Sequence, residues 1–83
     1  MQYHRKDDVY WTSQSYGTPK LKRGKVVAVV PERVHPEVCI PEGLQLKRPG
    51  NARDHESYLV QVGKSINLYW PLVKYLRNDV EDK

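Results

Sequence analysis

The sequence predicts a mainly β protein: a small barrel of five or six short strands with one short helical turn near the C-terminus. Hydrophobic residues alternate over 58–62 and 66–70, on both sides of Gly63-Lys64-Ser65, which is the pattern of a hairpin. Residues 26–30 read Val-Val-Ala-Val-Val, and valine favours a pleated strand because it branches at Cβ. No segment keeps a helical period of 3.6 residues. A barrel, closed or half-closed, is the expected arrangement because closure removes exposed strand edges.

The N-terminal segment, residues 1–19, mixes charged and aromatic residues without a helical stripe. We expect it to be loosely ordered, or to fold on a partner, with at most a short strand over 9–12. Residues 20–25 are expected to form a basic turn before the valine strand. Pro31 ends that strand because proline has no amide hydrogen for a ladder.

Residues 31–56 are too many for a structureless loop in a compact domain. Two short strands over 37–40 and 44–47 are therefore predicted, joined by Pro41-Glu42-Gly43. Proline presets φ at the second position of a turn, and glycine accepts a positive φ. Residues 48–54 would then form an exposed basic loop.

In the C-terminal part, Pro71 ends the second strand of the hairpin, as Pro31 ends the valine strand. Residues 72–76 are expected to form one helical turn or a short closing strand. Leu68 and Trp70 are assigned to the core, together with one of the two tyrosines at 58 and 69. The predicted organisation is thus a loosely ordered segment over 1–19, a small β-barrel over 20–77 and a polar tail over 78–83.

The composition describes one small domain of 83 residues with a net charge of +4, from 14 Lys and Arg against 10 Asp and Glu. A basic balance favours polyanionic partners, chiefly nucleic acid, although the same charge also serves solubility alone. The single Cys39 excludes an intramolecular disulfide and suits a reducing cytoplasm. No signal peptide and no apolar run of about 18 residues is visible, so a cytoplasmic protein without membrane contact is expected.

Residues 24–30, Gly-Lys-Val-Val-Ala-Val-Val, resemble the opening strand of SH3-like barrels, including KOW-type modules. Residues 68–76 resemble the strand, one-turn helix and closing strand with which such barrels end. The plasmid-encoded type II dihydrofolate reductases are similar in size and in this ending. Their Val-Gln-Ile-Tyr motif is replaced over 67–70 by Asn-Leu-Tyr-Trp, which lacks the glutamine. The resemblance therefore implies an SH3-like fold and not the reductase activity.

Arg53-Asp54-His55-Glu56-Ser57 is the densest cluster of proton-transfer groups. An enzyme would use His55 as the base, with Asp54 or Glu56 orienting it and Ser57 as the nucleophile. Neighbours on an extended chain point to opposite faces, so adjacent members of this cluster do not converge. We interpret it as a solvated loop that enters a strand and expect no catalytic residues.

No metal or cofactor site is expected. His35, Cys39 and His55 lack the close pairing of zinc ligands, and Cys39 lies between two apolar residues, where it acts as a small apolar side chain. Gly63-Lys64-Ser65 matches the end of a phosphate-binding loop, but Tyr58 stands where the first glycine belongs.

Taken together, the basic residues are the strongest indication of function in the sequence. Loops and strand ends of a barrel gather at its two rims, so these cations are expected to form one positive arc. Lys and Arg bind phosphates, and exposed aromatic rings stack on bases. The predicted nucleic-acid-binding residues are Lys20, Lys22, Arg23, Lys25, Lys47, Arg48, Arg53, Lys64, Tyr58 and Tyr69, with Tyr10, Trp11 and Tyr16 as further rings if the N-terminal segment crosses the barrel.

Three classes of function follow. The first is a small non-enzymatic barrel that binds DNA or RNA. The second is a protein-interaction module or small inhibitor, of the kind that mobile elements encode, that binds a partner protein through an aromatic groove; the acidic residues among the basic ones suit it. The third is an enzyme whose site forms in the pore of a homo-oligomer. The first is the favoured interpretation.

Overall fold

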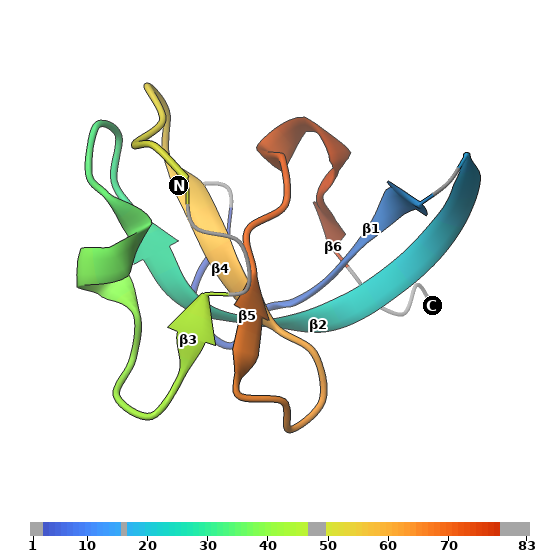
Figure 1. Ribbon diagram of the computed structural model, residues 1–83, viewed down its shortest axis with the longest axis horizontal. Coiled ribbons are helices and arrows are strands. Elements are labelled where there is room, and N and C mark those ends of the chain that lie inside the picture. Colours follow the sequence, from blue (N-terminus) through green and yellow to red (C-terminus); the bar gives the residue numbers. More distant parts are fainter. Residues whose placement is uncertain (1–2, 16, 47–49, 79–83) are drawn as a thin grey trace.

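The computed structural model describes residues 3–15, 17–46 and 50–78 (Figure 1). It confirms the prediction of a mainly β protein, because every element other than two single turns of 3-10 helix is a strand in the described residues. The elements are β1 (Asp8–Ser15), β2 (Thr18–Val30), η1 (Pro36–Cys39), β3 (Gln45–Leu46), β4 (Ser57–Gln61), β5 (Asn67–Tyr69), η2 (Val73–Tyr75) and β6 (Arg77–Asn78).

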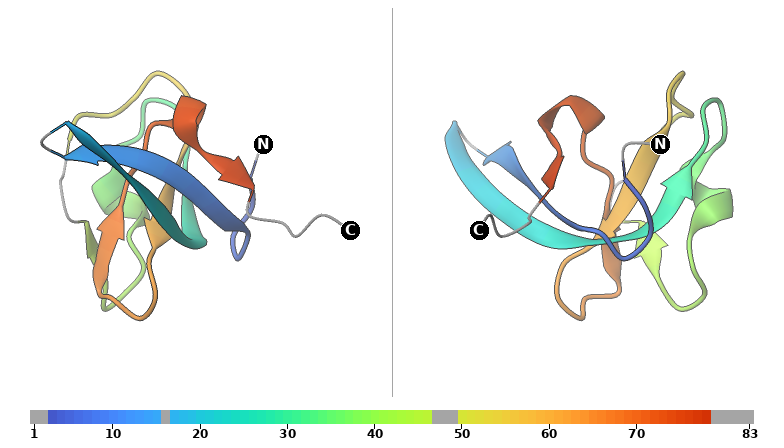
Figure 2. Two further views of the ribbon diagram at one scale, coloured as in Figure 1. Left: turned by 90° about the vertical axis from the view of Figure 1, so that its right-hand side faces the viewer. Right: turned by 180° about the vertical axis from the view of Figure 1, so that it is seen from behind.

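The six strands form one curved sheet in the order β3-β5-β4-β2-β1-β6. Neighbouring strands are antiparallel except for β3 and β5, which run parallel. In the described part of the chain no ladder joins β3 to β6, so the sheet remains open between its two end strands. Figure 2 shows the resulting bend, with β2 running across the molecule as one long curved strand.

Strand β2 is shared by both halves of the sheet. It pairs with β1 from Thr18 to Lys25 and with β4 from Lys25 to Val30. The β2–β4 register shifts between Val26 and Ala28, which marks a β-bulge. This extra residue reverses the side-chain alternation, so that Val26 packs in one hydrophobic cluster while Ala28 and Val30 pack in another.

The first hydrophobic cluster, which we call the first core, depends on the N-terminal segment. Val9 is completely buried in it, Trp11 is 5% exposed, and the Tyr3 ring meets the Tyr58 ring edge-on at 5.1 Å. The Tyr3 hydroxyl also donates a hydrogen bond of 2.7 Å to the Leu76 carbonyl. The expectation of a loosely ordered segment over 1–19 is therefore wrong for its described residues, because β1 supplies one wall of the first core.

The second core lies on the other side of the sheet and contains Ala28, Val30, Leu59 and Leu68. Residues 39–46 cover it. The strand expected over 37–40 is wrong: Pro36 opens the 3-10 turn η1 there, since proline fits the first position of a helix. The strand expected over 44–47 exists as β3, and the turn before it is confirmed, with φ of +88° at Gly43 and a hydrogen bond from the Leu44 amide to the Pro41 carbonyl.

The C-terminal hairpin and helical turn are confirmed. β4 and β5 pair antiparallel, with Gly63 at a φ of +60°, but β5 is shorter than the predicted strand and the connection spans 62–66. Of the two forms expected for residues 72–76, the helical turn is present as η2; the closing strand, β6, follows it at Arg77–Asn78 and pairs with β1. Asn78 belongs to that strand and not to the polar tail; residues 79–83 lie outside the described residues.

Trp70 is half-buried against the second core and is held on three sides. Its indole Nε1 donates a hydrogen bond of 2.8 Å to Ser57 Oγ. The Arg53 guanidinium lies 3.8 Å from its ring centroid and donates to the carbonyls of Trp70 and Pro71 at 2.8 and 3.0 Å. Arg53 thus ties the segment before β4 to the end of β5, which corrects the expectation that it belongs to an exposed basic loop.

We predict that Trp70→Ala lowers the free energy of unfolding by about 3 kcal/mol, because it removes a large packed ring and the anchor of Arg53. Trp70→Phe should lower it by about 1 kcal/mol through the lost Ser57 hydrogen bond. Urea denaturation followed by circular dichroism measures both. Tyr75→Ala, at a ring that is 52% exposed, is the control and should change stability by less than about 0.5 kcal/mol. Equal stability of Trp70→Ala and wild type would contradict this packing.

Gly24 is required by close approach of β4. A Cβ at this position would lie 2.5 Å from the Gln61 carbonyl oxygen and 2.7 Å from Val60 Cγ1. We therefore expect Gly24→Ala to destabilise the protein by about 1–3 kcal/mol in the same urea measurement. Gly63→Asn is the matched control, because nothing lies within 4 Å of its Cβ position and asparagine tolerates a positive φ. A Gly24→Ala variant as stable as this control would refute the steric argument.

Candidate nucleic-acid interface

The far end of the β1–β2 hairpin extends beyond its neighbours in the sheet, and we call residues 11–15 and 17–24 the arm. β6 pairs with β1 only at Val9 and Tyr10, and β4 pairs with β2 only from Lys25 onward. Figure 1 shows the arm reaching past β6 on the right, and Figure 2 shows the same projection from behind. Residues 20–25, expected as a basic turn, are therefore part of a long strand.

Strand alternation divides the basic residues of β2 between two faces. Trp11 pairs with Lys22, so Lys22 lies on the inner face, which continues into the first core; Lys20 shares that face two residues away. Tyr10 pairs with Arg23 and Asp8 with Lys25, which places these two cations on the outer face. The expected single positive arc is thus incorrect for β2, because its cations line both sides of one ribbon.

On the inner face, aromatic rings and Lys22 meet at the root of the arm. The Trp11 and Tyr69 rings lie 5.7 Å apart with an interplanar angle of 58°. Lys22 Nζ lies 5.2 Å from the Tyr69 ring centroid, within cation–π range. Tyr69 is half-buried, so it keeps part of its ring at the surface, whereas Trp11 does not.

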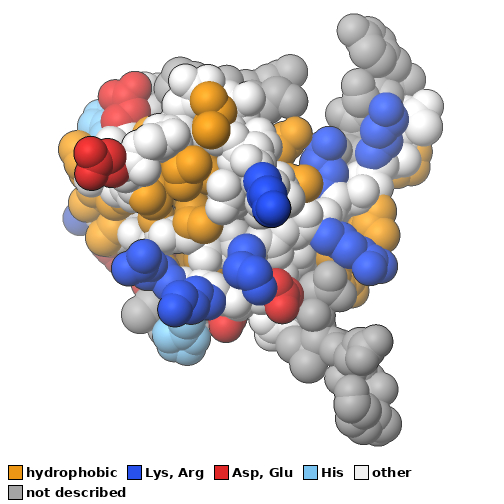
Figure 3. Space-filling model, turned by 90° about the horizontal axis from the view of Figure 1, so that it is seen from below, with side chains coloured by type: hydrophobic (Ala, Val, Ile, Leu, Met, Phe, Trp, Pro, Cys, Tyr) orange, Lys and Arg blue, Asp and Glu red, His pale blue; other side chains and the backbone are white. Residues whose placement is uncertain are grey.

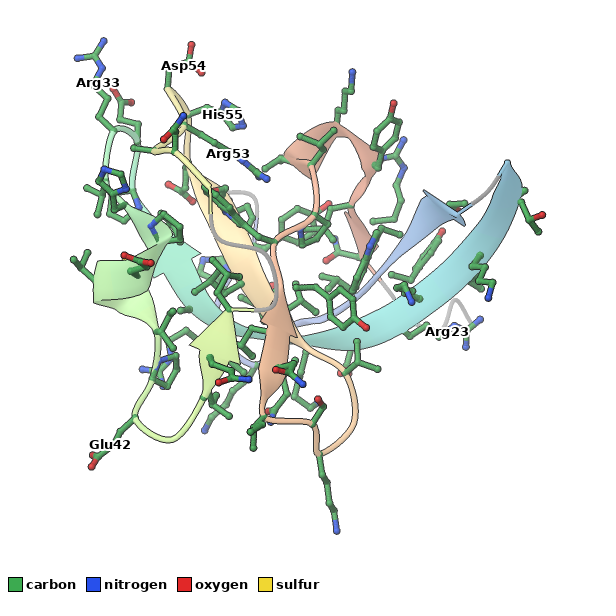
Figure 4. All side chains as sticks on the ribbon, viewed as in Figure 1. Arg23, Arg33, Glu42, Arg53, Asp54 and His55 are labelled. Atoms are coloured by element: carbon green, nitrogen blue, oxygen red, sulfur yellow. The ribbon has the colours of Figure 1, made fainter. Side chains whose placement is uncertain are left out.

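On the outer face, an open hollow of about 350 Å³ lies where the arm leaves the sheet. Lys25 Nζ forms an ion pair of 2.7 Å with Asp8 Oδ1 at its edge, with both side chains 56% exposed. In Figure 4, Arg23 lies below the β2 ribbon, far from the labelled residues that precede β4. The hollow is lined by Asp8, Arg23, Gly24, Lys25, Gln61 and Gly63, and Lys64 follows in the exposed β4–β5 connection.

Basic and acidic residues are separated along the chain, which the positions of the basic residues alone do not show. Residues 9–31 contain Lys20, Lys22, Arg23 and Lys25 and no Asp or Glu, which gives this segment a formal charge of +4. All ten acidic residues lie outside it. Figure 3, which views the molecule from below, shows Lys and Arg side chains spread across that side with some acidic groups between them.

The other predicted interface residues have different positions. Tyr58 is only 2% exposed and donates a hydrogen bond of 2.7 Å to Glu56, so its ring cannot stack on a base; it is the tyrosine that joins the core. Arg53 serves the fold through Trp70, and partial burial lowers its pKa. Tyr16, Lys47 and Arg48 lie outside the described residues.

The structure separates the members of the Arg53–Ser57 cluster. Ser57 is buried and accepts the Trp70 indole hydrogen bond, while Glu56 accepts from Tyr58. His55 Nδ1 and Asp54 Oδ1 form an exposed pair at 3.0 Å (Figure 4). Among the residues with described positions, no three His, Cys, Asp or Glu side chains gather into a possible metal site.

No protein-family description, curated protein or solved structure matches this chain. No helix within residues 3–15, 17–46 and 50–78 is long and apolar enough to cross a bilayer. Function is therefore inferred from the arm and its surroundings.

The exposed His55–Asp54 pair gives a pH prediction. The hydrogen bond from His55 lowers the pKa of the Asp54 carboxyl below 3.8. A lowered carboxyl pKa stabilises the fold above the unfolded-state pKa, and this contribution is lost as pH falls through the folded-state pKa. NMR titration of the Asp54 carboxyl carbon should show this lowered pKa. His55→Ala should raise it toward 3.8 while His35→Ala leaves it unchanged; an Asp54 pKa insensitive to His55 would contradict the pair.

Proposed function

We propose that this protein is a small, non-enzymatic nucleic-acid-binding protein of the cytoplasm, and that the arm is its binding element. One observation carries the proposal: four cations stand on or at the root of a projecting hairpin, in a segment of 23 residues without a single carboxylate. Such a segment attracts a polyanion at long range and releases its condensed counterions on contact.

Lys25 and Lys22 have internal partners that a phosphate can replace. The Lys25–Asp8 ion pair is more than half exposed, and such pairs contribute about 0–1 kcal/mol. The contact of Lys22 with the Tyr69 ring contributes about 0.5–1 kcal/mol at an exposed site. Both lysines therefore reach phosphates at little loss to the fold. Tyr69, partly exposed beside Lys22, remains a candidate stacking residue, as does the half-buried Tyr10 on the outer face, and Lys64 adds a cation beyond the hollow.

We also propose that the domain is SH3-like. A long second strand shared between two halves, a 3-10 turn before the last strand, and pairing of that last strand with the first support this assignment. The proposal concerns architecture and brings no activity with it.

A protein-interaction module is the second candidate, and the surface near η2 favours it. Leu72 is 47% exposed and Tyr75 52% exposed there, and the Trp11–Tyr69 ring pair lies at the root of the arm. Exposed apolar and aromatic side chains of this kind suit contact with a partner protein. Binding to a defined partner protein with little dependence on salt would favour this candidate over nucleic acid.

We predict that the triple variant Lys20→Gln, Lys22→Gln, Arg23→Gln weakens binding to mixed-sequence nucleic acid uniformly across sequences. Each lost phosphate contact should reduce the slope of log K against log salt by about 1, so the triple variant should reduce it by about 3. Fluorescence anisotropy with labelled DNA and RNA oligonucleotides, at salt concentrations from about 20 to about 200 mM, measures this slope.

The control carries the same change of charge away from the arm: Arg5→Gln, Lys64→Gln, Lys74→Gln, all at exposed residues. It should change the slope by about 1 at most, through Lys64. Equal losses in the two triple variants would show that net charge and not the arm determines binding. Absence of binding by the wild-type protein to any of the oligonucleotides at the lowest salt would refute the proposed function.

A further inference from the structure

The outer face of the sheet brings charged and polar side chains together where the arm begins, and this bears on how nucleic acid is held if the protein binds it as proposed. Lys25 lies opposite Asp8 on one side and opposite Gln61 on the other, so these three side chains share that face. Arg23 lies on the same face two residues away, about 7 Å along the strand. The two cations therefore border the point where the β2–β4 ladder ends.

The hollow of about 350 Å³ is bordered by this row of side chains and by the start of the β4–β5 connection. Gln61 Nε2 donates a hydrogen bond of 2.8 Å to the Ser65 carbonyl, which fixes the connection beside the arm. Gly63 has a φ of +60°, and no described atom outside its chain neighbours lies within 4 Å of its Cβ position. The volume is near the lower limit of about 300–1,000 Å³ for small-molecule pockets, so the hollow admits one small charged group and does not enclose a larger ligand.

The lining contains two cations and one carboxylate, and the carboxylate is bound to one of the cations. Lys25 Nζ lies 2.7 Å from Asp8 Oδ1, the length of the charge-assisted hydrogen bonds that an ammonium group also forms with phosphate oxygens. Both side chains are 56% exposed, so the pair contributes little to the fold and an incoming anion can replace Asp8. Arg23, exposed beside them, carries the planar fork of donors that suits a phosphate. The hollow thus has the donors of a phosphate site, with a carboxylate in the place of the ligand.

The neighbouring side chains favour a phosphate that is carried by nucleic acid. Tyr10 lies opposite Arg23 on the same face and is half-buried, so part of its side chain is available to a sugar or a base next to the phosphate. Arg77 lies opposite Tyr10 on the other side, which extends the cationic surface across three strands. We propose that the hollow binds one backbone phosphate of nucleic acid through Arg23 and Lys25, and that the Asp8 carboxylate occupies this place in the free protein and lowers the affinity.

The sign of one substitution tests this arrangement. Asp8→Asn should tighten binding of the DNA or RNA oligonucleotide that the wild type prefers by about three- to tenfold, because it frees Lys25 and removes a negative charge from the hollow. Lys25→Gln should weaken the same binding severalfold. A carboxylate that only orients Lys25 would give the opposite sign, since its loss would weaken binding. The measurement is anisotropy at about 0.1 M salt, where exposed charges more than about 10 Å apart are largely screened.

Two controls make the same charge changes elsewhere on the surface. Glu42→Gln matches Asp8→Asn, and Arg33→Gln matches Lys25→Gln. Glu42 and Arg33 are exposed and lie on the left in Figure 4, away from Arg23 on the right. Each control should change the affinity by less than about twofold at this salt concentration, and circular dichroism should show an unchanged fold for all four variants.

Amide chemical shifts locate the bound phosphate. When the isotope-labelled protein is titrated with the same oligonucleotide, the largest changes should include the amides of Gly24, Lys25 and Gly63, which line the hollow. Inorganic phosphate should move the same amides but bind more weakly, because it lacks the sugar and base that Tyr10 would contact.

Several results would overturn the phosphate site while leaving nucleic-acid binding intact. They are unchanged or weaker binding by Asp8→Asn, undiminished binding by Lys25→Gln, and shifts confined to η2 or to the far end of the arm. Inorganic phosphate that binds as tightly as the oligonucleotide would overturn the assignment to a nucleic-acid backbone, and a poly-glutamate peptide that does so would show a site for carboxylates instead. A wild-type protein that binds no oligonucleotide even at the lowest salt would overturn both proposals.

Discussion

The β-bulge in β2 is the constraint on which the rest of the structure depends. A regular strand over Val26–Val30 would direct alternate residues to two fixed faces, and Ala28 and Val30 would then face the first core with Val26. The register shift between Val26 and Ala28 sends them to the opposite side. One strand thereby closes two small cores, each built by residues from distant parts of the chain. An 83-residue domain has little apolar surface to spare, so such double use of one strand gives it two filled interiors.

The same strand explains why a projecting arm exists. β4 stops pairing with β2 at Lys25, and Gly24 lies so close to Gln61 that no larger residue fits there without movement. Before this point, within the described residues, β2 pairs with β1 alone, so the two strands leave the sheet as a ribbon. Cations on the two faces of a ribbon are held apart by its thickness, whereas cations on a loop are free to gather. The geometry of the proposed interface is therefore a consequence of where one ladder ends.

Local patterns were sufficient for part of this fold and not for the rest. The hairpin around Gly63 and the valine strand were predictable because alternation, turn residues and β-branching act within a few residues. β1 is longer than the strand predicted over 9–12, and the burial of Val9 and Trp11 depends on partners such as Leu76, far along the chain. The bulge was not predictable from a run that is apolar throughout. Tyr58 and Tyr69 occupy similar sequence patterns; the Tyr3 ring packs edge-on against Tyr58, which is the buried one of the two. The basic residues were identified, but their division between faces required knowing that they form a strand.

The hydrogen bond from the Tyr3 hydroxyl to the Leu76 carbonyl joins residues 73 positions apart. While the chain is being synthesised, the first core must therefore wait until the segment containing Leu76 has left the ribosome. Up to that moment Val9 and Trp11 stay uncovered on one side, even though β1 and β2 can already pair as a local hairpin. Closing so long a loop has an entropic barrier that is met before its contacts are gained, which is typical of slow-folding topologies with high contact order. Nascent chains of this protein would accordingly expose the Trp11 ring until Leu76 is available to cover it.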